Sequence, residues 1–166
     1  KSSFGNSKSW RINSLFSSDN GFREESGYDQ QKFHLKNKFD LLDSETTFNL
    51  RITNLNQETA GYITGKDVYK DSLSSKKNLN PEAYRDAQSL KANLNLLWDT
   101  EDISISFVPY FRKTKMEFMQ HYLPGTPVEN NSHKSLGFMY IFSNSMINAE
   151  WTTGIQMEFA KVKLEE

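Results

Sequence analysis

Apolar and polar residues alternate along most of this chain. In one segment Ile103, Ile105 and Phe107 share one parity, and Ser104 and Ser106 share the other. Strict alternation indicates a β-strand that presents its two faces to different surroundings, whereas an amphipathic helix repeats every three to four residues. Helical spacing is hard to find here. The pattern therefore predicts an all-β protein.

Seven segments carry this alternation. They cover residues 8–17, 30–41, 46–56, 88–98, 103–113, 135–143 and 146–160. Consecutive strands joined end to end form an antiparallel up-and-down meander, which is the arrangement we expect.

The expected connections differ in length at the two ends of the strands. Three are short, around residues 42–44, 99–102 and 143–145. The other three are long, over residues 18–29, 57–87 and 114–134. Loops beyond about 12–15 residues are uncommon in compact soluble domains. Short turns at one end and long loops at the other are typical of outer-membrane β-barrels.

Large aromatic residues gather near the short-turn end, on the apolar parity. They are Trp10, Phe39, Phe48, Trp98, Phe142 and Trp151. An aromatic belt of this kind lies at the lipid headgroups in membrane barrels. A soluble β-sandwich is the alternative, since its inner faces also carry aromatic residues at every second position. Expected strands of about 10 residues, against a usual 5–6, favour the membrane barrel.

Composition narrows the function classes. With 20 basic and 21 acidic residues among 166, the chain lacks the basic excess of a general nucleic-acid binder. The absence of cysteine excludes a disulfide scaffold and a cysteine-ligated metal site. No apolar run approaches the ~18 residues of a membrane helix, but a barrel strand needs only alternate apolar positions. Seven is an odd number, whereas bacterial single-chain barrels have even strand numbers. We therefore expect these residues to be a fragment of a large transmembrane β-barrel.

Several short stretches resemble TonB-dependent outer-membrane receptors of the siderophore-receptor type. GYDQQKFHL at 27–35 resembles a strand entry, and TNLNQETAGY at 53–62 resembles the passage into a long loop. NPEAYRDA at 80–87 is similar to the return of such a loop to its strand. VPYFR at 108–112, followed by MEFMQHYLPG at 116–125, resembles another strand-to-loop passage. The resemblance spans most of residues 27–140.

This resemblance implies a function. Such receptors are barrels of about 22 strands, filled by an N-terminal plug, in the bacterial outer membrane. They take up scarce nutrients, commonly ferric siderophores, with energy delivered through TonB. It further implies extracellular long loops, periplasmic short turns, and contact with outer-membrane lipid and lipopolysaccharide. We expect neither plug nor TonB box within these residues. The alternative is a passive porin-like or adhesin-like barrel segment whose loops bind a surface partner.

Two expected loops and one strand parity hold the candidate ligand-binding residues. Loop 114–134 and loop 57–87 offer soft, aromatic and basic side chains, which could grip a ligand or simply pack the loops together. The polar parity is rich in basic residues, which could attract an anionic complex or contact the plug and lumen water. The loop candidates are Met116, Met119, His121, Tyr122, Tyr62, Tyr69, Tyr84 and Arg85. The basic positions are Lys32, Lys36, Lys38, Arg51, Lys91 and Arg112, and we include Arg112 among the candidates.

Enzymatic activity is not expected. The histidines are His34, His121 and His133, and no serine or aspartate stands beside them in a recognisable catalytic motif. Their spacing predicts no metal site, and we expect no cofactor.

Overall fold

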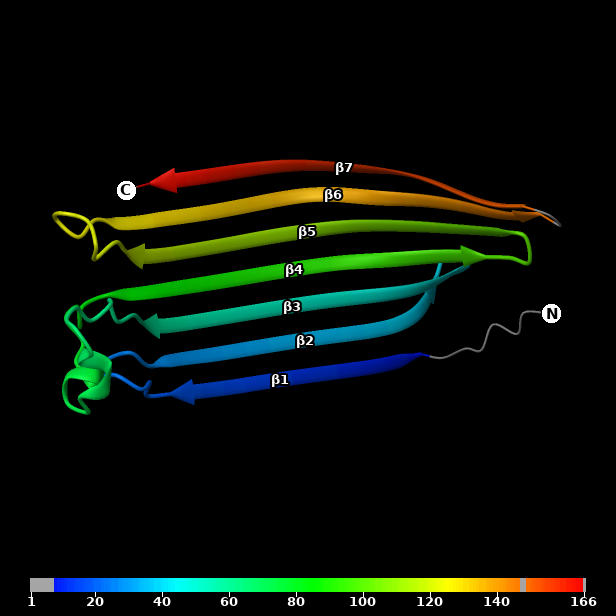
Figure 1. Cartoon of the computed structure of the whole chain (residues 1–166). Helices are drawn as coiled ribbons and strands as arrows, with labels where there is room; N and C mark the ends of the chain where they lie inside the picture. The colour runs from blue at the N-terminus through cyan, green and yellow to red at the C-terminus, as the bar shows by residue number, and fades with distance from the viewer. Residues whose placement is uncertain (1–7, 147–148, 166) are drawn as a thin grey trace.

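The computed structural model describes residues 8–146 and 149–165, and these form a single antiparallel sheet (Figure 1). Each strand pairs with the next in sequence, so the order is β1-β2-β3-β4-β5-β6-β7. The sheet is open, with β1 and β7 at its edges. The strands are β1 (Ser9–Asp19), β2 (Tyr28–Leu41), β3 (Ser44–Glu58), β4 (Tyr84–Asp99), β5 (Ile103–Met119), β6 (Val128–Met146) and β7 (Ala149–Glu165). The all-β meander of seven strands is thereby confirmed.

The described turns at one end of the sheet are short. Leu42 and Asp43 join β2 to β3, and both have positive φ, 52° and 56°. That geometry belongs to the two-residue hairpin turn whose twist matches the flanking strands. The Trp98 indole N–H donates to the Leu42 carbonyl at 2.8 Å and so ties this turn to β4. Between β4 and β5, the Thr100 N–H donates to the Ile103 carbonyl at 2.8 Å. We call this end of the sheet the turn end.

At the other end, the loop end, the strands are longer than the alternation predicts. The connections there cover residues 20–27, 59–83 and 120–127. Loop 59–83 remains long and contains two short 3-10 helices, η1 (Val68–Lys70) and η2 (Ser74–Lys76). The expected loop 114–134 is wrong in most of its length, because β5 continues to Met119 and β6 begins at Val128. Residues 143–145 were expected as a turn and lie inside β6. Of the expected strand 146–160, residues 147–148 lie outside the described part of the chain.

The strand extensions have a physical cause. At the loop end both faces of the sheet carry polar residues, so hydrophobic alternation stops while the backbone hydrogen-bond ladder continues. Lys113, Lys115 and Glu117 illustrate this, since each pairs with a residue of β6 despite its charge. A ladder needs backbone N–H and C=O groups and no particular side chain.

The register gathers the alternating apolar residues on one face. Phe33 pairs with Ile52, and Ile52 pairs with Leu90. Directly paired residues in an antiparallel sheet point to the same side. We call this side the apolar face and the opposite side the polar face. The apolar face carries Trp10, Ile12, Phe16, Phe33, Leu35, Phe39, Leu41, Phe48, Leu50, Ile52, Leu90, Ala92, Leu94, Leu96, Trp98, Ile103, Ile105, Phe107, Pro109, Phe111, Leu136, Phe138, Tyr140, Phe142, Trp151, Ile155, Met157 and Phe159.

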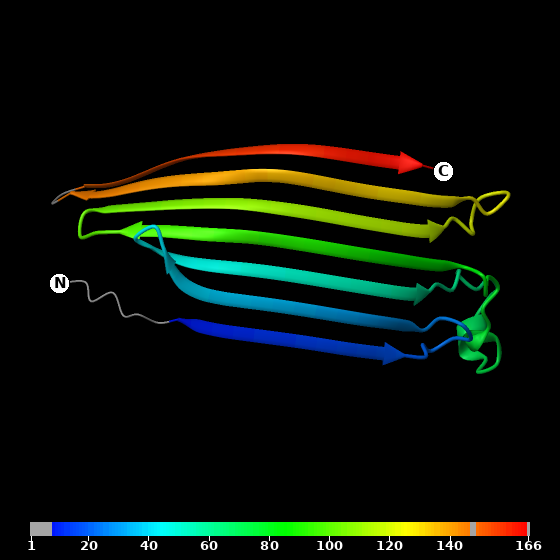
Figure 2. The ribbon, with the colours of Figure 1, turned by 180° about the vertical axis from the view of Figure 1, so that it is seen from behind.

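No second layer covers either face within the described residues, as the front and rear views show (Figures 1 and 2). Among these residues the buried apolar side chains are those of Ala83 and Leu96. On the apolar face, Leu136 is 62% exposed although its strand has neighbours on both sides. A soluble sheet of this composition would bury such a face against another layer. No helix of the described residues is long and apolar enough to cross a membrane.

The apolar face forms a band whose loop-end limit is slanted. Residues that are directly paired across successive strands form a row, which runs across the sheet. At the loop end of the band, the last apolar residue of β2 is Phe33, and Ile52 of β3 and Leu90 of β4 lie in the same row. On β5, β6 and β7 the continuous apolar band ends one row nearer the turn end, at Phe111, Leu136 and Phe159. The apolar pair Met119 and Val128 lies apart from this band, at the loop end of β5 and β6.

The tryptophans at the turn end shift in the same direction. Trp10 on β1 lies in the row of Phe48. Trp98 on β4 lies nearer the turns, in the row of Phe142. Trp151 on β7 lies one row nearer the turns than Trp98. The loop-end limit and the tryptophans at the turn end therefore both descend toward the turn end from β1 to β7, whereas Phe39 on β2 already lies one row nearer the turns than Phe48 on β3.

Candidate functional site

The polar face carries a row of basic side chains across four consecutive strands. His34 on β2 pairs with Arg51 on β3, Arg51 pairs with Lys91 on β4, and Lys91 pairs with Arg112 on β5. Directly paired residues have Cβ atoms about 4.5–5.5 Å apart. We call these four residues the basic row. Lys32 and Lys36 lie in the two rows beside it.

The middle of the basic row has no acidic partner among the described residues. Arg51 and Lys91 are exposed, and neither forms an ion pair in the part of the chain that the structure describes. Like charges directly opposite one another destabilise a sheet. The His34 Nε2 atom is buried and has no hydrogen-bond partner among the described residues. The row can therefore attract and hold an anion by charge and by hydrogen-bond donation.

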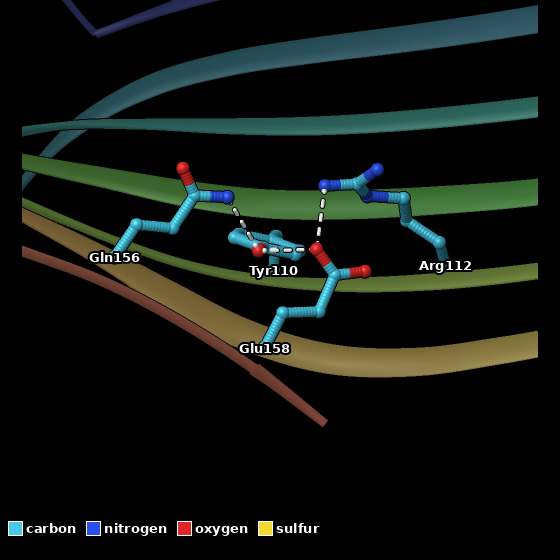
Figure 3. A network of polar contacts seen from close by, with 4 residues as sticks. All are labelled: Tyr110, Arg112, Gln156 and Glu158. Atoms are coloured by element: carbon cyan, nitrogen blue, oxygen red, sulfur yellow. Dashed lines mark hydrogen bonds and ion pairs between the residues drawn. The ribbon is translucent and has the colours of Figure 1, made fainter. Parts of the chain in front are cut away.

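Arg112, at one end of the row, belongs to a polar network that joins β5 to β7 (Figure 3). The Tyr110 hydroxyl donates to a Glu158 carboxylate oxygen at 2.9 Å, and an Arg112 guanidinium nitrogen donates to the same oxygen at 3.4 Å. The Gln156 amide donates to the Tyr110 hydroxyl at 3.0 Å. The Arg112 guanidinium also lies 4.6 Å from the centre of the Tyr110 ring, a cation–π distance.

Gly137 makes room for this network. It lies on β6 between Tyr110 of β5 and Glu158 of β7 and pairs with both. A Cβ atom at position 137 would lie 2.7 Å from the Tyr110 Oη atom and 2.5 Å from the Met157 carbonyl oxygen. The Tyr110 ring thus crosses β6 only because residue 137 has no side chain. The sequence alone could not reveal this partnership, because it depends on the register of three strands.

The polar network neutralises part of the positive charge of the basic row and leaves the rest without an ion pair in the described part of the chain. Glu158 compensates Arg112, so this arginine is held in place and its charge is partly neutralised. Lys38 pairs with Glu45 at 3.2 Å near the turn end. Among the described residues, the positive charge without an ion pair on this part of the polar face therefore lies on Arg51 and Lys91, at mid-height, and on Lys32 and Lys36 in the adjoining rows. These groups can bind an anion, and among the described residues no three histidines, aspartates or glutamates come together as a metal site.

Three tyrosines of the candidate set lie exposed in the loops. Tyr62 and Tyr69 are in loop 59–83, Tyr122 is in loop 120–127, and their exposed fractions are 78%, 68% and 62%. The Lys70 ammonium lies 5.5 Å from the Tyr69 ring centre, and the rings of His121 and Tyr122 meet edge to face at 5.6 Å. These rings are available for stacking on a ligand.

The remaining candidates lie on strands and not in loops. Met116 and Met119 are on β5, and Met116 points to the polar face, paired with Ala87 and Asn131. Tyr84 and Arg85 are the first residues of β4 and point to opposite faces. The Tyr84 hydroxyl donates to Glu117 at 2.9 Å, and the Arg85 guanidinium donates to Gln57 at 2.7 Å. The structure therefore does not bring Tyr84 and Arg85 together.

One arginine that sequence reasoning missed connects two loops. Arg23, in loop 20–27, donates from Nε and Nη2 to the Lys77 carbonyl at 2.9 and 2.6 Å. Its Nη1 atom donates to the Gly61 carbonyl. Gly61 in turn lies against His121, since a Cβ atom there would be 3.1 Å from the histidine Nε2 atom. Arg23 thereby holds loop 59–83 in position at the loop end.

Comparisons with protein-family models, with curated proteins and with solved structures find no match to this chain.

Proposed function

We propose that this chain is part of the lipid-spanning wall of a large outer-membrane β-barrel that takes up a scarce nutrient. In this proposal the nutrient is a ferric siderophore or another iron complex, and transport is energised through TonB. The observation that carries the proposal is the uncovered apolar band, with a slanted loop-end limit, on one face of the sheet.

The height of the band supports lipid contact. From Leu90 to Trp98 the apolar face of β4 is continuous. Eight steps of about 3.3 Å make this roughly 26 Å along the strand. At a strand tilt of about 40°, the band is roughly 20 Å tall along the membrane normal, near the ~25 Å lipid-facing band of outer-membrane barrels.

The slanted loop-end limit supports a barrel in particular. Strands of a closed barrel tilt by about 35–45° from its axis, and their register is staggered accordingly. A flat slab of lipid therefore crosses neighbouring tilted strands at progressively shifted rows. The loop-end limit of the apolar band and the three tryptophans of the turn end shift in the same direction from β1 to β7, as such a slab would require. The inner face of a soluble sandwich has no reason to show this slant.

The polar face then lines the lumen. Arg51 and Lys91 would focus a positive potential into it and raise the local concentration of an anionic complex. The exposed tyrosines of loops 59–83 and 120–127 would make the first contact outside the cell. In the receptors that the sequence resembles, a plug rearrangement then opens the lumen. We propose the same route here, with the basic row on the path of the nutrient.

Uptake by the complete gene product tests this proposal. The full reading frame would be expressed in a Gram-negative host lacking its own siderophore receptors, and uptake of radioactive ferric complexes would be compared with and without functional TonB. We expect TonB-dependent uptake of an anionic complex. Uptake that is unaffected by loss of TonB would establish the passive porin-like alternative, and absence of the protein from the outer membrane would refute both.

A paired variant tests the lumen assignment. Arg51→Gln with Lys91→Gln should lower the uptake rate of an anionic ferric complex by about tenfold, at the lower end of electrostatic steering effects. Uptake of a neutral complex should change little. The matched control is Lys66→Gln with Lys76→Gln, which removes two exposed charges from loop 59–83. Equal losses in both variants would contradict a lumen role for the basic row.

A further inference from the structure

A second group of basic side chains lies on the apolar face, where its apolar band ends. Lys113 on β5 pairs with Lys134 on β6, and Lys134 pairs with Lys161 on β7. All three side chains are exposed and share one face. We call them the lysine row. Three like charges side by side destabilise the sheet unless an anion lies among them.

The described part of the chain does not supply that anion. Within residues 8–146 and 149–165, none of the three lysines forms an ion pair, and Lys134 has only the Phe111 ring 5.9 Å away. The next lysines toward the loop end, in contrast, have acidic partners. Lys163 pairs with Glu165, and the Lys115 ammonium lies 4.0 Å from a Glu117 oxygen. Acidic partners thus accompany the outer lysines and are missing from the lysine row.

The lysine row lies directly above apolar side chains. One row nearer the turn end are Phe111, Leu136 and Phe159, each two residues from a lysine of the row on the same strand. Beside Lys113 the sheet carries a groove of about 580 Å³. Its apolar-face lining consists of Ile52, Leu90, Asn54, Gln88, Lys113 and Lys115. The groove therefore combines an apolar wall with amide and ammonium groups.

We propose that the lysine row binds the phosphate headgroup of an anionic lipid in the outer leaflet, with its acyl chains along the apolar band. This inference rests on the proposed function in two respects, namely that the apolar face contacts lipid and that the loop end lies on the extracellular side. Ammonium groups bind phosphate as compact point charges, and basic residues at a membrane surface attract anionic lipids. The occupant must be amphipathic because the cations and the apolar wall adjoin. The lysine row is distinct from the basic row, which lies on the opposite face.

Lipid binding to the complete, detergent-extracted protein tests the proposal. Native mass spectrometry would measure retention of lipid A, a phosphorylated glycolipid, against zwitterionic phosphatidylcholine and inorganic phosphate. The triple variant Lys113→Gln, Lys134→Gln, Lys161→Gln should bind lipid A at least about tenfold more weakly. The matched control Lys32→Gln, Lys36→Gln, Lys91→Gln removes three charges from the polar face and should bind lipid A like the unmodified protein.

Several outcomes would overturn the site. They are unchanged lipid A binding in the lysine-row variant, an equal loss in the control, equal retention of phosphatidylcholine, and full competition by inorganic phosphate, which would mean a simple anion site. Heat-modifiable gel migration would confirm that both variants fold. Ferric uptake by the unmodified protein is measured separately. Lipid A binding that depends on the lysine row without TonB-dependent uptake would refute the transport proposal and leave the lipid site standing.

Discussion

A charge placed at mid-height of the apolar face tests which side of the sheet meets lipid. Phe107 lies on β5 between its partners Leu96 and Tyr140, with its ring 5.7 Å from that of Phe138. Its neighbour Ser106 points to the polar face, where its hydroxyl donates to Asn95 at 3.1 Å. Phe107→Arg and Ser106→Arg therefore introduce the same charge at the same height on opposite faces.

The two substitutions should differ strongly in cost. Arginine on the lipid face near the bilayer midplane costs about 2–4 kcal/mol, so Phe107→Arg should reduce the folding equilibrium constant roughly 30- to 700-fold. Ser106→Arg loses one neutral hydrogen bond, about 0.5–1.5 kcal/mol, while its guanidinium group remains in water.

Denaturant unfolding of the complete protein in lipid vesicles, followed by tryptophan fluorescence, would measure both free energies. Phe107→Leu is the conservative control, expected to cost less than about 1.5 kcal/mol. Equal losses for the two arginine variants, or a larger loss for Ser106→Arg, would refute the assignment of the faces.

Three further perturbations follow from the site. Gly137→Val should lower the free energy of unfolding by about 1–3 kcal/mol, because the valine side chain would collide with the Tyr110 ring and the Met157 carbonyl. Tyr110→Phe keeps the ring, loses one hydrogen bond and should cost less. A larger loss for Tyr110→Phe in denaturant unfolding would contradict the passage of the Tyr110 ring across β6. Arg23→Ala should speed protease cleavage of loop 59–83 several-fold, because the carbonyl groups of Lys77 and Gly61 lose their donors, and the control Lys66→Ala should cleave at the original rate. Hydrogen bonds from Ser74 hold the pKa of Asp71 below its ordinary value. The stabilisation of the loop by the Asp71 carboxylate is therefore complete above the ordinary carboxyl pKa of about 3.9. It is lost as the pH falls through the lowered pKa that Asp71 has in the folded protein. Ser74→Ala should raise the pKa of Asp71 in a nuclear magnetic resonance titration, and an unchanged value would refute this capping role.

The alternation of apolar and polar residues was enough to predict the seven strands and which residues share a face, because a few residues of the opposite kind do not disturb a repeat of two. Asn37 falls on the apolar parity, but it is 8% exposed and its amide donates to the Ser9 carbonyl at 3.3 Å. Val108 and Met139 fall on the polar parity and pair with each other there. These exceptions have local partners, so they do not shift the register.

The strand ends and the site depended on contacts that alternation does not encode. The C-terminal residues of β5 and the N-terminal residues of β6 include polar side chains on both faces, so the hydrophobic alternation ends before the backbone hydrogen-bond ladder does. Sequence reasoning placed Met116 and Met119 in a loop for that reason, and the structure places them in β5. The link between Arg112 and Glu158 spans three strands, and the lysine row also appears only when the register aligns three strands.

Lipid and water accessibility along β5 test the central claim most directly. The chain has no cysteine, so single cysteines at residues 104–107 and 111 can carry a nitroxide spin label in the complete protein, with any cysteines elsewhere replaced. In outer-membrane lipid, we expect residues 105, 107 and 111 to be relaxed by oxygen, which concentrates in lipid, and residues 104 and 106 by a water-soluble nickel complex. Equal access of the nickel complex to all five positions would contradict a lipid-facing wall.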